Sequence, residues 1–146
     1  MSAARPRRHW LFKSEPGAFG WDDQVALGRK GGQWDGVRNY QARNNMREMK
    51  TGDLGFFYHS VDEKRIVGVV EVCAEAHHDT TTEDERWDCV DVRAVAPMPT
   101  PVTLAEMKAE PALKDFALVR QSRLSVVPVS DAEWRIICRM GGYEAG

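Results

Sequence analysis

The chain has 146 residues, of which 42% are hydrophobic and 29% are charged, and a chain of this size buries about 68–70% of its unfolded surface in one domain. Its formal net charge is −2 and its isoelectric point is about 6.1, which excludes a generally basic protein that holds nucleic acid through overall charge. It contains no run of about 18 apolar residues and no apolar segment after the start, so we expect no membrane span, no secretory signal and a cytoplasmic location.

The three cysteines, Cys73, Cys89 and Cys138, are widely spaced and stand beside apolar residues. This pattern favours buried free thiols over disulfides or a metal site. The sequence has no phosphate-binding loop and no metal-ligand spacing, so we expect no metal and no cofactor. It has no internal repeat, and we expect a monomer.

The first elements follow a short basic start. Residues 1–8 contain little to bury and predict a disordered tail, whereas residues 9–142 form one domain and residues 143–146 a short C-terminal tail. His9–Lys13 alternates as a strand that ends at Pro16. Asp22 is a candidate cap for a short helix that ends at Gly28.

The stretch from Trp34 to Arg47 mixes aromatic, arginine and asparagine side chains. Asn39 is a candidate N-cap for a helix over Tyr40–Lys50, with Gly52 closing it. Ala42, Met46 and Met49 form its one apolar stripe. The polar side that remains, together with Arg38 at the helix start, is typical of an anion site, although a solvated basic helix gives the same pattern.

Three strands and one loop are predicted next. Leu54–Ser60 is aromatic and apolar, and Arg65–Ala76 is so continuously apolar that both faces of its sheet must be covered. Gly68 within it indicates a bend or a close backbone approach. Residues 77–86 predict a surface loop, because His77, His78 and Asp79 have no matching metal ligands elsewhere. Trp87–Ala96 alternates as a strand that three prolines then stop, Pro97, Pro99 and Pro101.

The last part of the chain contains two capping boxes, at Thr103–Glu106 and Ser130–Glu133. The first opens a helix that ends before Pro111, and the second opens a closing helix that ends at Gly141. Between them a helical piece over 112–118 and a strand over 124–129 are predicted. No strand–helix–strand period is present, which favours an α+β domain of five to six mainly antiparallel strands.

Four separated motifs resemble the EVE domain family, and the resemblance covers about residues 8–142. They are Trp10–Pro16, Trp34–Asn44, Lys50–Asp53 followed by Phe57–Ser60, and Ser122–Val126. The resemblance implies a PUA-like pseudo-β-barrel with helices in the connections and at the C-terminus, in one superfamily with the ASCH and YTH domains. It also implies a pocket that holds a modified base of DNA or RNA, and no catalytic residues.

The residues that match the family's pocket motifs fall into two sets. Those expected at the base are Ser14, Glu15, Trp34, Asn39, Tyr40, Asn44, Tyr58, His59, Ser60 and Ser125, and those expected at flanking phosphates are Lys13, Arg38, Arg43 and Arg123. A flipped base stacks on aromatic rings and exposes its Watson–Crick edge to polar groups. Tyr58 has a commoner alternative, a core tyrosine with a satisfied hydroxyl.

Two other functions stay open at this point. If His59 and Glu15 converge with Lys13 and Arg38, they form an acid–base site for an enzyme that acts on a nucleotide or nucleic acid. The second alternative is a protein-interaction domain with a vestigial pocket, which needs fewer donors around aromatic rings than this sequence provides.

Overall fold

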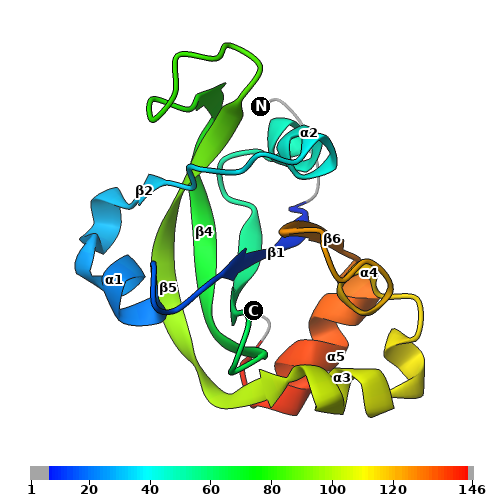
Figure 1. Cartoon of the computed structure of the whole chain (residues 1–146). Helices are drawn as coiled ribbons and strands as arrows, with labels where there is room; N and C mark the ends of the chain where they lie inside the picture. Colours follow the sequence, from blue (N-terminus) through cyan, green and yellow to red (C-terminus); the bar gives the residue numbers. More distant parts are fainter. Residues whose placement is uncertain (1–6, 145–146) are drawn as a thin grey trace, which may run out of the picture.

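Six strands form one sheet in the computed structural model, which describes residues 7–144 (Figure 1). The order across the sheet is β2-β5-β4-β3-β1-β6. Their bounds are β1 His9–Ser14, β2 Gly32–Gln33, β3 Leu54–His59, β4 Arg65–His78, β5 Asp88–Thr103 and β6 Val126–Val129. β1 runs parallel to β3, and the other pairings between described strands are antiparallel. Most of the predicted tail, residues 1–6, lies outside the described residues, as do residues 145–146.

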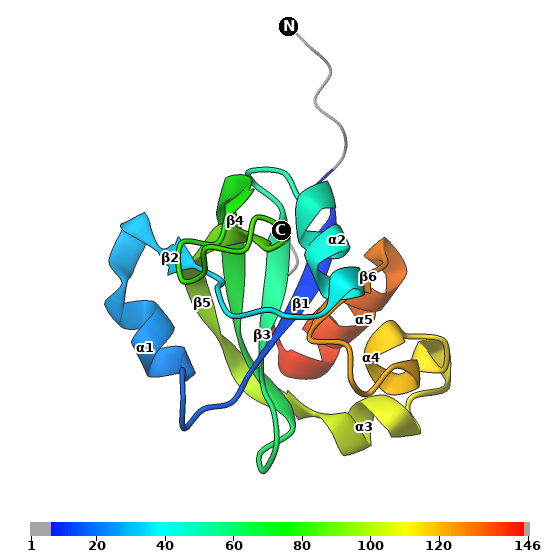
Figure 2. The same cartoon turned by 45° about the horizontal axis from the view of Figure 1, so that its top comes forward.

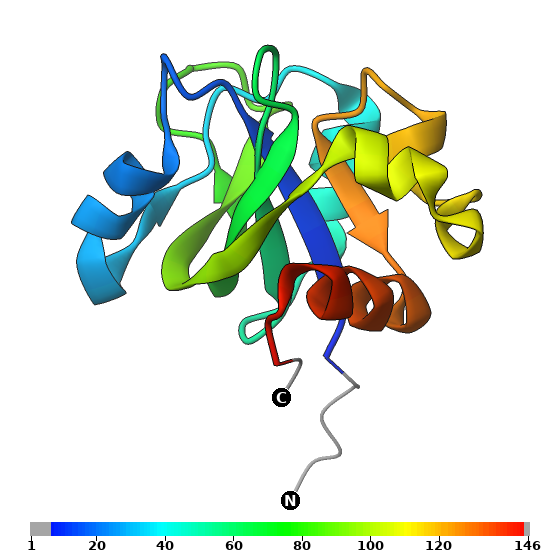
Figure 3. The same ribbon diagram turned by 90° about the horizontal axis from the view of Figure 1, so that it is seen from below.

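The helices lie in the connections and at the C-terminus, so the predicted α+β class is confirmed. Their bounds are α1 Trp21–Ala26, α2 Tyr40–Glu48, α3 Leu104–Ala109, α4 Ala117–Arg120 and α5 Asp131–Gly141, with 3-10 turns η1 Gly28–Lys30 and η2 Pro111–Leu113. Figures 1, 2 and 3 show α1 at the β2 edge of the sheet and α3, α4 and α5 gathered at the opposite, β6 edge. Within residues 7–144 no helix has both the length and the apolar composition needed to cross a bilayer.

Most helix starts follow the predicted capping chemistry. The Asn39 side chain accepts a hydrogen bond from the Ala42 amide, and both predicted capping boxes are formed. The α1 start is different, because the helix begins one residue before Asp22 and the Asp23 carboxylate accepts from the Gly20 amide. The predicted helical piece over 112–118 is split into η2 and α4.

The prediction that prolines stop the third long strand is wrong. β5 continues through Pro97, Pro99 and Pro101 to Thr103. Proline is tolerated in a strand where its missing N–H faces no partner. On its outer side β5 pairs with β2 only at Asp91 and Val92, so the proline stretch runs along a free edge.

The core fills both faces of the sheet, as the apolar run in β4 predicts. Trp10, Phe12, Phe56 and Phe57 are fully buried. Cys89 and Cys138 are buried free thiols whose pKa burial raises to about 12, whereas Cys73 is partly exposed. The strand ends matter for the site, because the parallel register sets Lys13 beside Tyr58 and Ser14 beside His59.

Candidate nucleic-acid interface

A pocket of about 680 Å³ opens between the loop after β1 and the segment between β2 and α2. This volume is within the range of about 300–1,000 Å³ that is usual for small-ligand sites. Six of the predicted residues line it: Lys13, Ser14, Glu15, Trp34, Arg38 and Ser125. Those six come from three distant parts of the chain, which the fold brings together.

Main-chain hydrogen bonds hold the β1 side of the pocket. The Ser60 amide donates to the Ser14 carbonyl at 2.9 Å, and the Lys13 amide donates to the Ser125 carbonyl at 2.9 Å. The Ser14 hydroxyl donates to the Phe19 carbonyl at 2.5 Å. Burial lowers the pKa of the Lys13 ammonium, which donates to the Ser122 carbonyl at 2.8 Å. This wall therefore carries a partly desolvated cation beside a hydroxyl.

Two aromatic side chains, Trp34 and Phe19, form another part of the pocket lining. Trp34 is 7% exposed, and its indole makes edge-to-face contacts with Phe12, Phe19 and Phe57 at centroid distances of 5.2, 6.1 and 5.5 Å. Phe19 also lines the pocket, and the sequence analysis did not select it. Aromatic side chains with few polar groups around them are typical of a pocket for a planar ligand.

Asp79 anchors the third wall, which corrects the prediction of a surface loop over residues 77–86. β4 continues to His78, and Asp79 is only 1% exposed. Its carboxylate accepts from the Gly36 amide at 2.9 Å and from the Arg38 guanidinium at 3.1 Å. On its other oxygen it accepts from the Thr81 amide at 2.8 Å and the Thr81 hydroxyl at 2.6 Å.

These contacts set the charge at the pocket rim. Burial alone raises the pKa of Asp79, but the hydrogen bonds from Thr81, Gly36 and Arg38 outweigh it and lower the pKa to about 2. The carboxylate is thus ionised at neutral pH and fixes Arg38, whose side chain remains 39% exposed. No spacing in the sequence marks Asp79, because its partners are more than 40 residues away, apart from Thr81.

Asn39, Tyr40, Arg43 and Asn44 do not line the pocket. The Asn39 side chain caps α2 by accepting a hydrogen bond from the Ala42 amide, and the Tyr40 ring stacks on Trp87 at a centroid distance of 5.0 Å. Arg43 lies 4.8 Å from the Tyr40 ring and donates to Asn44. This cluster joins the start of α2 to the β4–β5 loop on the outer side of Arg38.

The Tyr-His-Ser strand end lies behind the pocket wall. Tyr58 is 3% exposed, and burial raises its pKa to about 12. His59 is 9% exposed, its Nε2 accepts from the Trp21 amide at 3.0 Å, and its Nδ1 lies 2.9 Å from the Glu63 carboxylate. Ser60 contributes its amide to the Ser14 carbonyl. Arg123 is exposed beside Ser122 and is not among the lining residues.

The EVE domain profile matches residues 8–140. The chain belongs to the EVE domain family. A crystal structure of an Agrobacterium tumefaciens protein shares 54% identity, covers 95% of this chain and 96% of its own, and has a TM-score of 0.93. Thymocyte nuclear protein 1 of Danio rerio is 38% identical over 88% of this chain and 69% of its own length. The crystal structure of human THYN1 in complex with 5-methylcytosine-containing DNA has a TM-score of 0.86, with 36% identity over 94% of this chain and 99% of its own.

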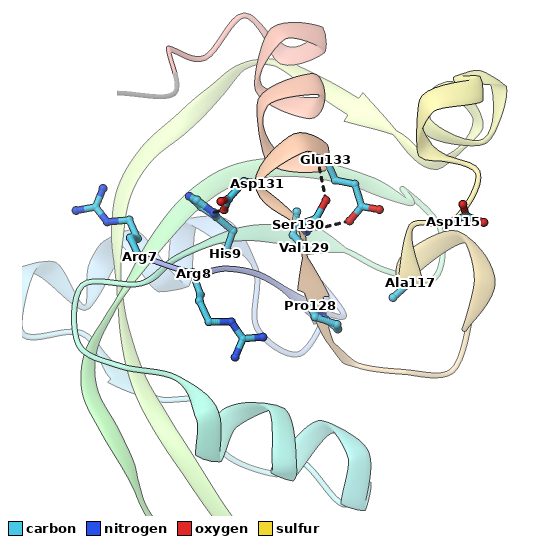
Figure 4. Close-up of a pocket in the computed structure, with 10 residues that line it drawn as sticks. All are labelled: Arg7, Arg8, His9, Asp115, Ala117, Pro128, Val129, Ser130, Asp131 and Glu133. Carbon is cyan, nitrogen blue, oxygen red and sulfur yellow. Dashed lines mark hydrogen bonds and ion pairs between the residues drawn. The ribbon is translucent and has the colours of Figure 1, made fainter. Parts of the chain in front are cut away.

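This EVE domain has a second pocket, of about 590 Å³, near the start of α5 (Figure 4). Figure 4 shows Arg7, Arg8 and His9 on one side, with His9 facing Asp131 at 3.2 Å. Asp115, Asp131 and Glu133 also line it, and the α5 start is already capped by Ser130 and Glu133. Three carboxylates and an occupied helix start disfavour a phosphate here. The first pocket is therefore the candidate site.

Proposed function

We propose that this EVE domain binds nucleic acid carrying a modified base and holds that base, turned out of its strand, in the pocket between the β1–α1 loop and residues 34–38. The observation that carries the proposal is the pocket's composition, in which the aromatic side chains of Trp34 and Phe19 share one lining with Lys13, Ser14 and Arg38. The human relative that was solved with 5-methylcytosine DNA covers nearly the whole chain and supports the same class of ligand.

Each wall has a distinct task in this proposal. The two aromatic side chains stack on or pack against the base, a contact worth roughly 1–3 kcal/mol. Lys13 and Arg38 hold the flanking phosphates and position the strand. The domain acts as a monomer in the cytoplasm, and selectivity comes from the pocket because a net charge of −2 gives no general attraction to nucleic acid.

The acid–base alternative has no specific support in this geometry. His59 does not line the pocket, and its two ring nitrogens already contact Trp21 and Glu63. Glu15 lines the pocket without His59 beside it. Among residues 7–144 no group of three or more His, Cys, Asp and Glu side chains is placed to bind a metal.

The test is a calorimetric titration with single-stranded oligonucleotides that carry 5-methylcytosine, 5-hydroxymethylcytosine, N6-methyladenine or no modification at one position. We expect one modified strand to bind at least several-fold more tightly than its unmodified match. Ala18→Phe places a ring at an exposed position that lines the pocket, so it should remove this preference. Ala112→Phe, exposed on η2, is the matched control and should retain it.

A second variant separates the phosphate contact from the pocket. Arg38→Ala should weaken binding of all strands and leave the preference for the modified base in place. If the wild type shows no preference, or if Ala18→Phe binds as the wild type does, the pocket is not the site.

A further inference from the structure

Asp35 is a carboxylate in the pocket that the motif comparison does not select. It lines the pocket beside Trp34, and within residues 7–144 its side chain makes no hydrogen bond or ion pair with the protein. Asp79, Arg38 and Lys13, the other charged groups of this region described above, each have a hydrogen-bond partner in the protein. A carboxylate without a partner in a cavity is placed to accept hydrogen bonds from a ligand.

The backbone on both sides of Asp35 is fixed. The Trp34 amide donates to the Val90 carbonyl at 2.8 Å, and the Gly36 amide donates to Asp79 at 2.9 Å. Gly36 has φ of 78°, a conformation that favours glycine and turns the chain at this point. Glu15 is the other carboxylate of the pocket lining that has no side-chain partner among the described residues, and like Asp35 it is exposed. Its side chain has one more rotatable bond, so Asp35 is the better preorganised of the two.

We infer that Asp35 reads the exocyclic amine of the bound base, so the pocket takes an amino-bearing base, cytosine or adenine in modified form, and rejects thymine and uracil. This inference rests on the proposed function. An ionised carboxylate is an acceptor only, and it matches the N4 amine of cytosine or the N6 amine of adenine. The O4 carbonyl of thymine would place two acceptors face to face, which leaves both unpaired.

The electrostatics of the loop agree with this role. Burial and the nearby Asp79 carboxylate raise the pKa of Asp35, whereas Arg38 opposes the shift. Asp35 is nevertheless exposed, so its carboxylate is open to a ligand, and the Asp79 charge beside it favours a hydrogen-bond donor as its partner.

The test compares 5-methylcytosine with thymine at one position of the same single strand. Both bases carry the C5 methyl group, so the ratio of their dissociation constants isolates the Watson–Crick edge. We expect the wild type to prefer 5-methylcytosine by roughly 5- to 150-fold, the range for one good base contact. Asp35→Asn should bring the ratio close to one, because an amide both donates and accepts. Asp22→Asn removes the same charge from an exposed α1 position that does not line the pocket, and it should keep the ratio.

Three results would overturn the inference and leave the proposed function standing. They are equal binding of 5-methylcytosine and thymine, an unchanged ratio in Asp35→Asn, and loss of the ratio in Glu15→Gln instead. If the panel selects N6-methyladenine, hypoxanthine replaces thymine, since it carries a carbonyl in place of the amine. Unaltered binding in Ala18→Phe, in contrast, removes the proposed function itself.

Discussion

At the scale of single residues, the Asp79 carboxylate lies outside the pocket lining and holds two parts of it in place, the Arg38 guanidinium and the turn at Gly36. Asp79 accepts hydrogen bonds from Gly36, Thr81 and Arg38 while it is 1% exposed. Each bond to an ionised acceptor contributes about 1.5–3 kcal/mol. Because Gly36 and Arg38 lie on either side of Val37 in the pocket wall, Asp79 couples stability to the geometry of the site.

Asp79→Asn should destabilise the protein by about 2–4 kcal/mol at pH 7, because the amide replaces one accepting oxygen by a donor that faces donors. Urea unfolding measures this, with Asp22→Asn as the control that should stay within about 0.5 kcal/mol of the wild type. Equal urea midpoints for Asp79→Asn and the wild type would show that the hydrogen bonds of the Asp79 carboxylate contribute nothing to stability.

The same carboxylate predicts a pH dependence. Its pKa is lowered from the ordinary value of 3.8 to about 2 in the folded protein, so the ionised form is favoured by folding. The stabilisation is complete above pH 3.8 and is lost as the pH falls toward 2, a change on the order of 2 kcal/mol. We expect the stability difference between wild type and Asp79→Asn to shrink over this range. A difference that stays constant from pH 5 to pH 2 would contradict the assignment.

At the scale of elements, one of the contacts between α1 and the sheet is made at a glycine. A Cβ built on Gly68 of β4 would lie 2.4 Å from the Trp21 ring at the start of α1. The sequence predicts a bend or a close backbone approach at Gly68, and the close neighbour is instead the side chain of Trp21. Trp21 also donates its amide to His59, and the Gln24 side chain donates to the Val92 carbonyl of β5. These contacts hold α1 against the sheet at the end of the β1–α1 loop.

Gly68→Ala should push Trp21 away from β4 and cost about 1–3 kcal/mol of stability. Gly17→Ala, in the β1–α1 loop, is the control for the glycine-to-alanine change, since nothing lies within 4 Å of a Cβ there. Urea unfolding and the near-ultraviolet signal of the tryptophans measure the two effects. If both variants behave like the wild type, α1 is not held through this contact.

At the scale of the whole molecule, a weakly acidic domain has to bind a polyanion through a few local cations. The expected contacts are Lys13, Arg38, Arg43 and Arg123, of which the structure brings only Lys13 and Arg38 to the pocket. The slope of log affinity against log salt reports how many phosphates are neutralised. It therefore measures how much of this set is used.

For single strands each phosphate contact contributes about 0.7 to the slope, so four contacts predict a slope of about −3 between 50 and 200 mM salt. Arg38→Ala should reduce its magnitude by about 0.7, whereas Arg135→Ala on α5, away from the pocket lining, should leave it unchanged. A slope steeper than about −6 would indicate a larger basic surface than these residues provide.

Local patterns in the sequence predict much of the fold because the interactions involved are local. The Asn39 cap, both capping boxes and the stripe of Ala42, Met46 and Met49 depend on residues at most seven positions apart, and all are formed. The motif from Trp34 to Asn44 also places Trp34 and Arg38 at the pocket. The same motif includes Asp35, whose position beside Trp34 was the available signal for it.

Tertiary structure decided what depends on distant partners. The sequence predicts Asp79 as a loop residue, whereas the end of β4 places its carboxylate against the Gly36 amide. The sequence predicts Tyr40 as a base platform, whereas its ring stacks on Trp87 of the β4–β5 loop and lies outside the pocket lining. The three prolines of β5 predict the end of a strand, but they lie at the edge of the sheet, where no neighbouring strand requires the N–H that proline lacks. The sequence by itself determined the family and the helix caps, since motifs and short-range spacing carry that information. Which side chains line the pocket was decided only by the three-dimensional packing of segments that are separate in the sequence.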